Sequence, residues 1–327
     1  MPLNEKLNLF IENTNALRRE FVWHSMMTKR LVALLYTQEN MPVDINAIKN
    51  CHDLIKQNTG PFSTFRGNMT LCISSLLSLS ENPHEMLNET LKVYDLLKKA
   101  KFSPSDYLVI AAFEIANQAE ENKYDDVVKR TRAFFEGMRS NRIFTTGQDD
   151  YIFAAMLGLS DLDVNVTTDR IERVNTRLRV EFNDKNSVQA LSQVLVLGGS
   201  DENILFCILK LRDALRAKKI RLDKSYTLTA LGILTLLQAD VESIVRNIDD
   251  VQTRLRTQKG FGTFSVSTQE LLLYTTAIVA GVYADDIEAG LITASLSTSI
   301  TNIIIAQQVA MIAAITASSA AVAATSS

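Results

Sequence analysis

The stretch "KFSPSDYLVIAAFEIA", residues 101–116, joins an aromatic residue, a short polar turn with a proline, and a mostly apolar run. The same arrangement starts again near residues 64, 143, 181, 221 and 263. The apolar residues that open the six segments are Phe65, Phe102, Phe144, Phe182, Leu222 and Phe264. Their successive spacings are 37, 42, 38, 40 and 42 residues, so the sequence repeats with a period near 40.

A period near 40 with two helices per unit is typical of α-solenoids of the HEAT type. The apolar helix that opens each unit should line the interior, and an amphipathic helix should follow it on the outer surface. We expect these outer helices at residues 83–99, 125–140, 168–181, 201–219 and 240–258. The sequence therefore predicts an all-α fold, a right-handed, HEAT-like α-solenoid of antiparallel helix pairs.

The rest of the chain supports long helices. All five prolines lie within the first 104 residues, and a proline-free chain permits uninterrupted helices. Apolar residues recur at spacings of three and four, without the alternation of strands. Helix starts are marked by Asn82 followed by Pro83, and by a capping box of Ser267 and Glu270. We expect one continuous domain: an N-terminal helical cap over 1–58, helix pairs over 59–284, and an uncharged C-terminal helix with a frayed Ala/Ser tail over 285–327.

Composition narrows the function classes. A net charge of −3 over 327 residues gives no bulk electrostatic attraction for nucleic acid. The cysteines Cys51, Cys72 and Cys207 are few and widely spaced, as expected for reduced thiols in a cytoplasmic protein. The N-terminus carries no basic segment followed by an apolar one, so no secretory signal is expected. We predict a cytoplasmic protein.

The stretch "TGPFSTFRGN", residues 59–68, is the strongest candidate for a ligand site. Backbone N–H groups at a helix start bind anions, and Ser63, Thr64, Arg66 and Asn68 could assist here. The stretch lacks the glycine spacing and the lysine of a phosphate-binding loop. It also occupies the same place as five other helix starts, so helix capping is the competing interpretation, and the one we favour.

Other candidate chemistry is weaker. The histidines His24, His52 and His84 show no metal-ligand spacing, so we expect no metal, no cofactor and no catalytic residue.

The outer helices begin with acids and end with bases, as the helix macrodipole favours. Stacked helix ends could form a basic ridge that follows a nucleic-acid backbone, although acids at neighbouring helix starts would partly neutralise it. The bases expected on it include Lys210, Arg212, Arg216 and Arg221.

The C-terminal segment carries no charged side chain after Glu288. A membrane span is conceivable by length, but Gln307, Gln308, many hydroxyls and the absence of flanking Lys or Arg oppose it. Because Leu296, Ile300 and Ile304 form a helical stripe, we favour packing on the last helix pair. Packing on a second copy of the chain, which would give a homo-oligomer, is the close alternative.

The segments "GPFSTFRGN", "FSPSDYLVIAAFEIA" and "KGFGTFSVSTQELLLYTTAIVAG", together with the Ala/Ser-rich tail, resemble a family of uncharacterised bacterial proteins called domain of unknown function 4003. The resemblance covers nearly the whole chain. It implies a bacterial, cytoplasmic protein and no particular activity, so it supplies no catalytic residues.

The repeat, without a convergent catalytic set, favours a non-enzymatic helical-repeat scaffold that binds a protein or peptide partner. Two alternatives stay open. One is an enzyme or anion-binding protein with a site near residues 63–68. The other is a binder of the nucleic-acid backbone that uses the basic ridge.

Overall fold

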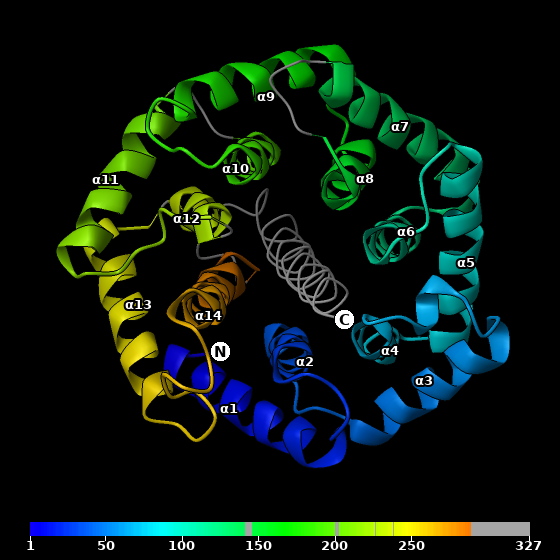
Figure 1. Cartoon of the computed structure of the whole chain (residues 1–327), viewed down its shortest axis with the longest axis horizontal. Coiled ribbons are helices and arrows are strands. Elements are labelled where there is room, and N and C mark those ends of the chain that lie inside the picture. The colour runs from blue at the N-terminus through cyan, green and yellow to red at the C-terminus, as the bar shows by residue number, and fades with distance from the viewer. Residues whose placement is uncertain (141–145, 200–202, 226, 238, 289–327) are drawn as a thin grey trace, which may run out of the picture.

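The computed structural model describes residues 1–140, 146–199, 203–225, 227–237 and 239–288 (Figure 1). These residues form 14 α-helices and three short 3-10 helices, η1 (Thr64–Arg66), η2 (Glu121–Lys123) and η3 (Gln148–Asp150), without any strand. The predicted all-α class is therefore confirmed for the described part of the chain. The predicted C-terminal helix and tail lie outside these residues from position 289 onward, and so does the expected anchor Phe144.

The helices alternate between two concentric layers (Figure 1). The outer layer runs around the molecule and contains α1 (Leu3–Glu20), α3 (Ile45–Asn58), α5 (Pro83–Lys99), α7 (Tyr124–Ser140), α9 (Val164–Leu178), α11 (Ile204–Ala217) and α13 (Val241–Arg256). The inner layer runs along the central axis and contains α2 (Met26–Gln38), α4 (Thr70–Ser78), α6 (Asp106–Gln118), α8 (Tyr151–Leu159), α10 (Lys185–Leu197), α12 (Thr227–Leu236) and α14 (Thr268–Glu288). Each outer helix packs against the inner helix that follows it.

Local sequence explains the two layers. The inner helices are apolar on most faces, and residues 108–116 of α6 and 151–158 of α8 are all buried. The outer helices bury one stripe, such as Ile244, Ile248 and Leu255 of α13. Outer helices were expected near these positions, and 83–99 matches α5 in both bounds.

The helix starts follow the capping rules. The side chain of Asn82 accepts a hydrogen bond from the backbone N–H of Glu85, with Pro83 in the first turn of α5. Ser267 accepts from the backbone N–H of Glu270 at 3.1 Å. The carboxylate of Glu270, however, binds Arg30 and Tyr274 instead of completing a capping box, because tertiary partners lie within its reach.

The stack of helix pairs closes on itself, whereas the sequence predicts a solenoid with a separate N-terminal helical cap. The last inner helix, α14, contacts both α1 and α2 (Figure 1). The segment 1–58, expected as a cap, supplies the pair α1–α2 and helix α3, which continue both layers. Curvature in repeat arrays comes from a small rotation between neighbouring units. Here these rotations add up to a full turn, so both terminal pairs are covered by each other.

A buried polar cluster joins the two ends of the ring. Arg30 of α2 is 2% exposed and forms an ion pair with Glu270 of α14 at 2.8 Å. Its other nitrogen donates to the carbonyl oxygens of Gly260 and Ser265 at 2.7 and 3.2 Å, and its guanidinium lies over the ring of Phe261. Tyr274 donates to Glu270 at 2.9 Å. We call these contacts the closure cluster.

The predicted apolar anchors differ in how deeply they are buried. Phe65, Phe102 and Phe182 are at most 4% exposed, as expected for residues that pack beneath a helix start. Phe264 is wrong as an anchor, because it is fully exposed and Phe261 fills the core position instead. The loop between α13 and α14 turns Phe261 toward Phe10 and Arg30, and a residue three positions later then points outward.

Candidate functional site

The predicted stretch 63–68 is occupied by the protein's own hydrogen bonds. Arg66 donates to the carbonyl oxygens of Lys56 and Thr59 and, at 3.1 Å, to the hydroxyl of Thr59, so it caps the C-terminal end of α3. Ser63 accepts from the backbone N–H of Phe65 at 3.3 Å. These contacts agree with the capping interpretation of the stretch.

The other two candidates, Thr64 and Asn68, carry no positive charge that could attract an anion. Thr64 shares a hydrogen bond with the hydroxyl of Tyr94 at 3.1 Å, and Asn68 is exposed. A carboxylate oxygen of Asp106 lies 3.1 Å from where a Cβ on Gly67 would be. This negative group beside the turn opposes the binding of an anion. The anion-site hypothesis for Ser63, Thr64, Arg66 and Asn68 stays a prediction.

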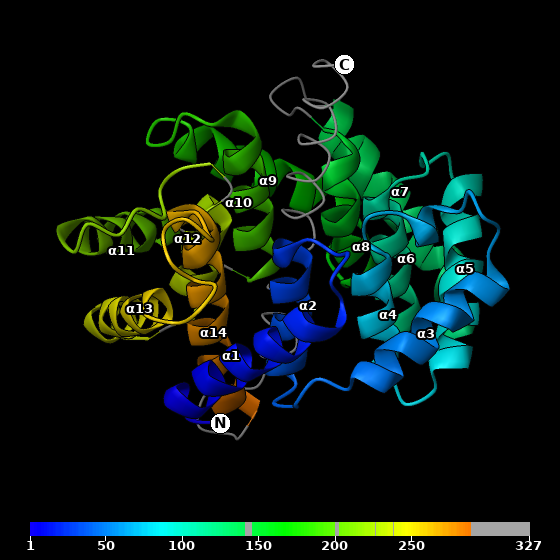
Figure 2. The ribbon, with the colours of Figure 1, turned by 60° about the horizontal axis from the view of Figure 1, so that its bottom comes forward.

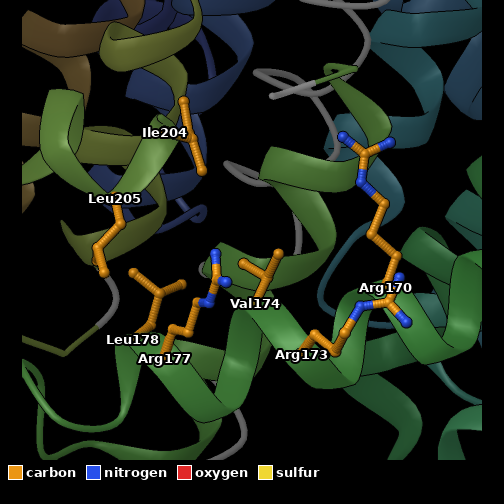
Figure 3. A pocket seen from close by; sticks show the side chains of 7 residues that line it. All are labelled: Arg170, Arg173, Val174, Arg177, Leu178, Ile204 and Leu205. Atoms are coloured by element: carbon orange, nitrogen blue, oxygen red, sulfur yellow. The ribbon is translucent and has the colours of Figure 1, made fainter. Parts of the chain in front are cut away.

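A different site stands out between α9 and the first turn of α11. A cavity of about 210 Å³ separates the two helices, and side chains from both line it (Figure 3). Its cationic wall is formed by Arg170, Arg173 and Arg177 of α9. Its apolar floor is formed by Val174 and Leu178 of α9 and by Ile204 and Leu205 of α11. We call this site the α9–α11 cleft.

The helical repeat explains the arginine wall. Residues three and four apart share a helix face, so Arg170, Arg173 and Arg177 rise along one side of α9 while Ile171 and Asn175 are buried on the other. Like charges at these spacings destabilise a helix by a few tenths of a kcal/mol. Among the described residues, no carboxylate forms an ion pair with any of the three. The fold therefore carries a repulsion that an anionic group would relieve.

Other arginines of this chain have structural partners. Arg130 donates to the carbonyl oxygens of Gly158, Ser160 and Leu162 at the end of α8. Arg256 donates to the carbonyl oxygens of Phe261 and Val266. The arginines of the α9–α11 cleft differ from these because they face an open cavity.

The apolar floor extends past the cleft. A second cavity of about 430 Å³ lies between α11, α12 and α13 and shares Ile204 with the first. Phe206, which is 71% exposed, and the exposed thiol of Cys207 lie at its edge with Lys210. The first turns of α11 thus separate two apolar hollows that both carry basic residues.

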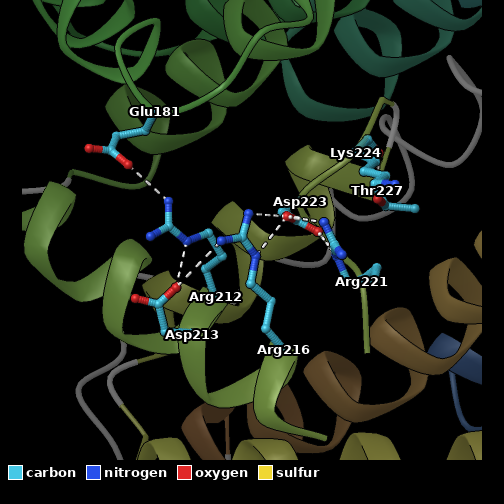
Figure 4. A network of polar contacts seen from close by, with 8 residues as sticks. All are labelled: Glu181, Arg212, Asp213, Arg216, Arg221, Asp223, Lys224 and Thr227. Carbon is cyan, nitrogen blue, oxygen red and sulfur yellow. Dashed lines mark hydrogen bonds and ion pairs between the residues drawn. The ribbon is translucent and has the colours of Figure 1, made fainter. Parts of the chain in front are cut away.

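Three arginines of the expected basic ridge pair with carboxylates near the end of α11 (Figure 4). Arg212 binds Glu181 at 3.0 Å and Asp213 at 2.8 Å, while Arg216 and Arg221 both bind Asp223. Partial burial acts to raise the pKa of Asp223, but hydrogen bonds from Arg221 and Arg216 lower it to about 2. These pairs anchor α11 to its neighbouring loops and leave less free charge for a nucleic-acid backbone.

The described residues hold no group of three or more His, Cys, Asp or Glu side chains placed to bind a metal ion. Cys51 is buried, and burial raises the pKa of its thiol to about 11, which leaves it protonated and a poor nucleophile at neutral pH. Burial also lowers the pKa values of His24 and His52. Within the described ranges, no helix combines the length and the hydropathy of a membrane span.

Two buried carboxyl groups, one on α6 and one in η3 directly before α8, were not expected from the sequence. Burial raises the pKa of Glu114 to about 7 and that of Asp150 to about 6, with the charge of Asp149 as a second cause for Asp150. Asp150 accepts hydrogen bonds from Gln189 and Gln193 of α10 at 2.8 and 2.7 Å, so it joins neighbouring pairs. Glu114 accepts from Gln118 at 2.7 Å.

Replacing Glu114 by glutamine should make stability less dependent on pH. The folded pKa of about 7 lies above the ordinary value of 4.5, so the folded state loses stability relative to the unfolded chain as pH rises from about 4.5 to 7. Each unit of pH in this window corresponds to about 1.4 kcal/mol. In urea titrations, the free energy of unfolding of Glu114→Gln should exceed that of the parent by about 3 kcal/mol at pH 8. This difference should disappear toward pH 4.5. The same change at Glu12, which is exposed, is the matched control. A difference between Glu114→Gln and the parent that stays constant at all pH values would contradict the prediction.

The fold and the cleft together define a class: a closed ring of helix pairs with a cationic, apolar-floored cleft in its outer layer. The sequence profile of the family described as "Protein of unknown function (DUF4003)" matches residues 13–309. The chain belongs to this family, as the resemblance in its sequence indicated. Comparison with curated proteins and with solved structures gives no match.

Proposed function

We propose that this protein is a non-enzymatic helical-repeat scaffold whose α9–α11 cleft binds an acidic, partly apolar peptide segment of another protein. The observation that carries the proposal is the pairing of Arg170, Arg173 and Arg177 with the apolar floor of the same cavity. A carboxylate-bearing segment would relieve the repulsion among the arginines. A large apolar side chain of the same segment would fill the space above Val174 and Ile204.

The chemistry of the cleft supports peptide binding over catalysis. Its lining residues are three guanidinium groups and four aliphatic side chains. A guanidinium stays protonated at physiological pH and can form two parallel hydrogen bonds with a carboxylate. The lining residues that the structure describes thus supply recognition groups, and none of them is a base or a nucleophile. Helical-repeat proteins use such surfaces for extended partners.

A direct test uses fluorescein-labelled synthetic peptides and fluorescence anisotropy. One 15-residue peptide alternates Asp or Glu with Leu and Phe, and its matched control carries Lys at every acidic position. We expect the acidic peptide to bind with a Kd of about 1–100 μM, with weaker binding at high salt because charges contribute. Equal binding of both peptides, or of neither, would contradict the proposal.

A further inference from the structure

Among the described residues, three aromatic side chains are almost entirely in water. Trp23 is 97% exposed, Phe62 100% and Phe264 106%, and Val22 beside Trp23 is 69% exposed. Single exposed apolar residues are common on protein surfaces. Complete exposure of three large aromatic rings is different, because each forgoes the burial that normally stabilises it.

The three rings come from equivalent connections. Trp23 lies between α1 and α2, Phe62 between α3 and η1, and Phe264 between α13 and α14, so each belongs to a loop that leads from an outer to an inner helix. These loops lie on the same side of the ring (Figure 2). The three helix pairs are consecutive around the ring, since α14 contacts α2 and α2 contacts α4.

Contacts place the loops beside one another. Arg30 of α2 holds the loop of Phe264 through the carbonyl oxygens of Gly260 and Ser265. The guanidinium of Arg18, at the end of α1, lies 3.4 Å from where a Cβ on Gly260 would be. The loop of Phe264 therefore lies against both helices that flank Trp23.

The loop of Phe62 is linked to the same region. It leads from α3, which contacts α1, into η1 and α4, and α4 contacts α2. Trp23, Phe62 and Phe264 thus project individually from neighbouring loops. We call the surface that carries these three rings the aromatic face.

The surroundings of the aromatic face are basic. Residues 18–29, 56–66 and 256–266 contain one acid, Glu20. They contain seven bases, of which Lys29 is buried and Lys56 pairs with Asp53 at 3.6 Å. The other five have no carboxylate partner among the described residues: Arg18, Arg19, Arg66, Arg256 and Lys259. This excess contrasts with the net charge of −3 for the whole chain. The face therefore complements a negatively charged, apolar surface.

We propose that the aromatic face docks on the surface of a bilayer that contains anionic phospholipid. Tryptophan and phenylalanine are favoured at the boundary between lipid headgroups and acyl chains, and basic residues near an anionic leaflet add attraction. Rings that project singly from three loops can enter a deformable lipid interface without a matching pocket. A protein partner would need three pockets at matching positions. This attachment is peripheral and involves no membrane-spanning helix.

Trp23 reports on its own environment, because it is the only tryptophan in the chain. The full chain is mixed with vesicles of phosphatidylcholine containing about 30% phosphatidylserine, or with vesicles of phosphatidylcholine alone. We expect co-sedimentation with the anionic vesicles, a blue shift of the tryptophan emission, and quenching by brominated acyl chains. High salt should release the protein, because screening weakens the charge term.

Variants distinguish binding through the aromatic face from nonspecific adsorption to lipid. Phe62→Ser combined with Phe264→Ser should weaken vesicle binding about tenfold or more, and Arg19→Glu combined with Lys259→Glu should weaken it similarly. The matched control is Phe206→Ser, which removes an exposed phenylalanine on α11 and should leave vesicle binding unchanged.

Several outcomes would overturn the proposal. They are no binding to anionic vesicles at low salt, equal loss in the Phe206→Ser control, and an unshifted Trp23 emission in the sedimented protein. Without vesicles, Trp23 could already be shielded from solvent while light scattering gives a doubled mass. That result would show that a second copy of the chain covers the aromatic face instead.

Discussion

Replacing Arg30 by alanine should lower the free energy of unfolding by about 3–5 kcal/mol, the usual cost of removing one partner from a buried ion pair. Arg30 is 2% exposed and connects α2 with Glu270 and with the loop before α14. Its removal would leave the carboxylate of Glu270 buried with only the hydroxyl of Tyr274 as a partner. Urea unfolding followed by circular dichroism measures the change.

Two further variants separate the closure cluster from the packing around it. Arg254, on the same seam, bonds only the amide side chains of exposed Asn4 and Asn8, so Arg254→Ala should cost less than about 1 kcal/mol. The double variant Arg30→Met with Glu270→Leu should be more stable than Arg30→Ala, because it leaves no unpaired buried charge. If all three variants unfold alike, the cluster does not hold the ring closed.

Reversing the three charges of the α9–α11 cleft should reduce binding of the acidic peptide by about 100-fold or more. The triple variant changes Arg170, Arg173 and Arg177 to glutamate, which replaces three attractions by three repulsions in a partly enclosed cavity. Each factor of ten corresponds to about 1.4 kcal/mol, so about 3 kcal/mol of lost interaction suffices. Fluorescence anisotropy with the labelled acidic peptide measures the change.

A matched control carries the same number of reversals elsewhere on the outer layer. Lys98, Lys123 and Lys129 lie on the surface and pair with acids three residues before them. Their change to glutamate alters the net charge equally and should leave peptide binding within about threefold. Similar losses in both triple variants would show that overall charge, and not the cleft, attracts the peptide.

The cleft and the aromatic face occupy different parts of the ring. The cleft involves α9 and α11, whereas the aromatic face belongs to the pairs that contain α1, α3 and α13 (Figure 1). Substitutions at one should therefore leave the other intact. A scaffold with two such surfaces could hold a peptide-bearing partner at a membrane.

Part of the candidate site was visible in the sequence. The sequence indicates that the outer helices end with bases, but it assigns those bases to a single ridge. The ridge itself is divided by tertiary structure, because Arg212, Arg216 and Arg221 find carboxylates from other segments, while Arg170, Arg173 and Arg177 face a cavity. Spacing along one helix shows which side chains share a face, and only packing shows what lies opposite them.

The sequence by itself determined the helical class, the alternation of apolar and amphipathic helices, and the start of α5 at Asn82 and Pro83, because these depend on residues within a few turns of one another. Tertiary structure decided the closure of the ring, the exposure of Phe264 in place of Phe261, and the pairing of Arg30 with Glu270, 240 residues away. The physical reason is that a small rotation between neighbouring helix pairs leaves no mark in hydrophobic periodicity. Summed around the ring, it determines which distant residues meet.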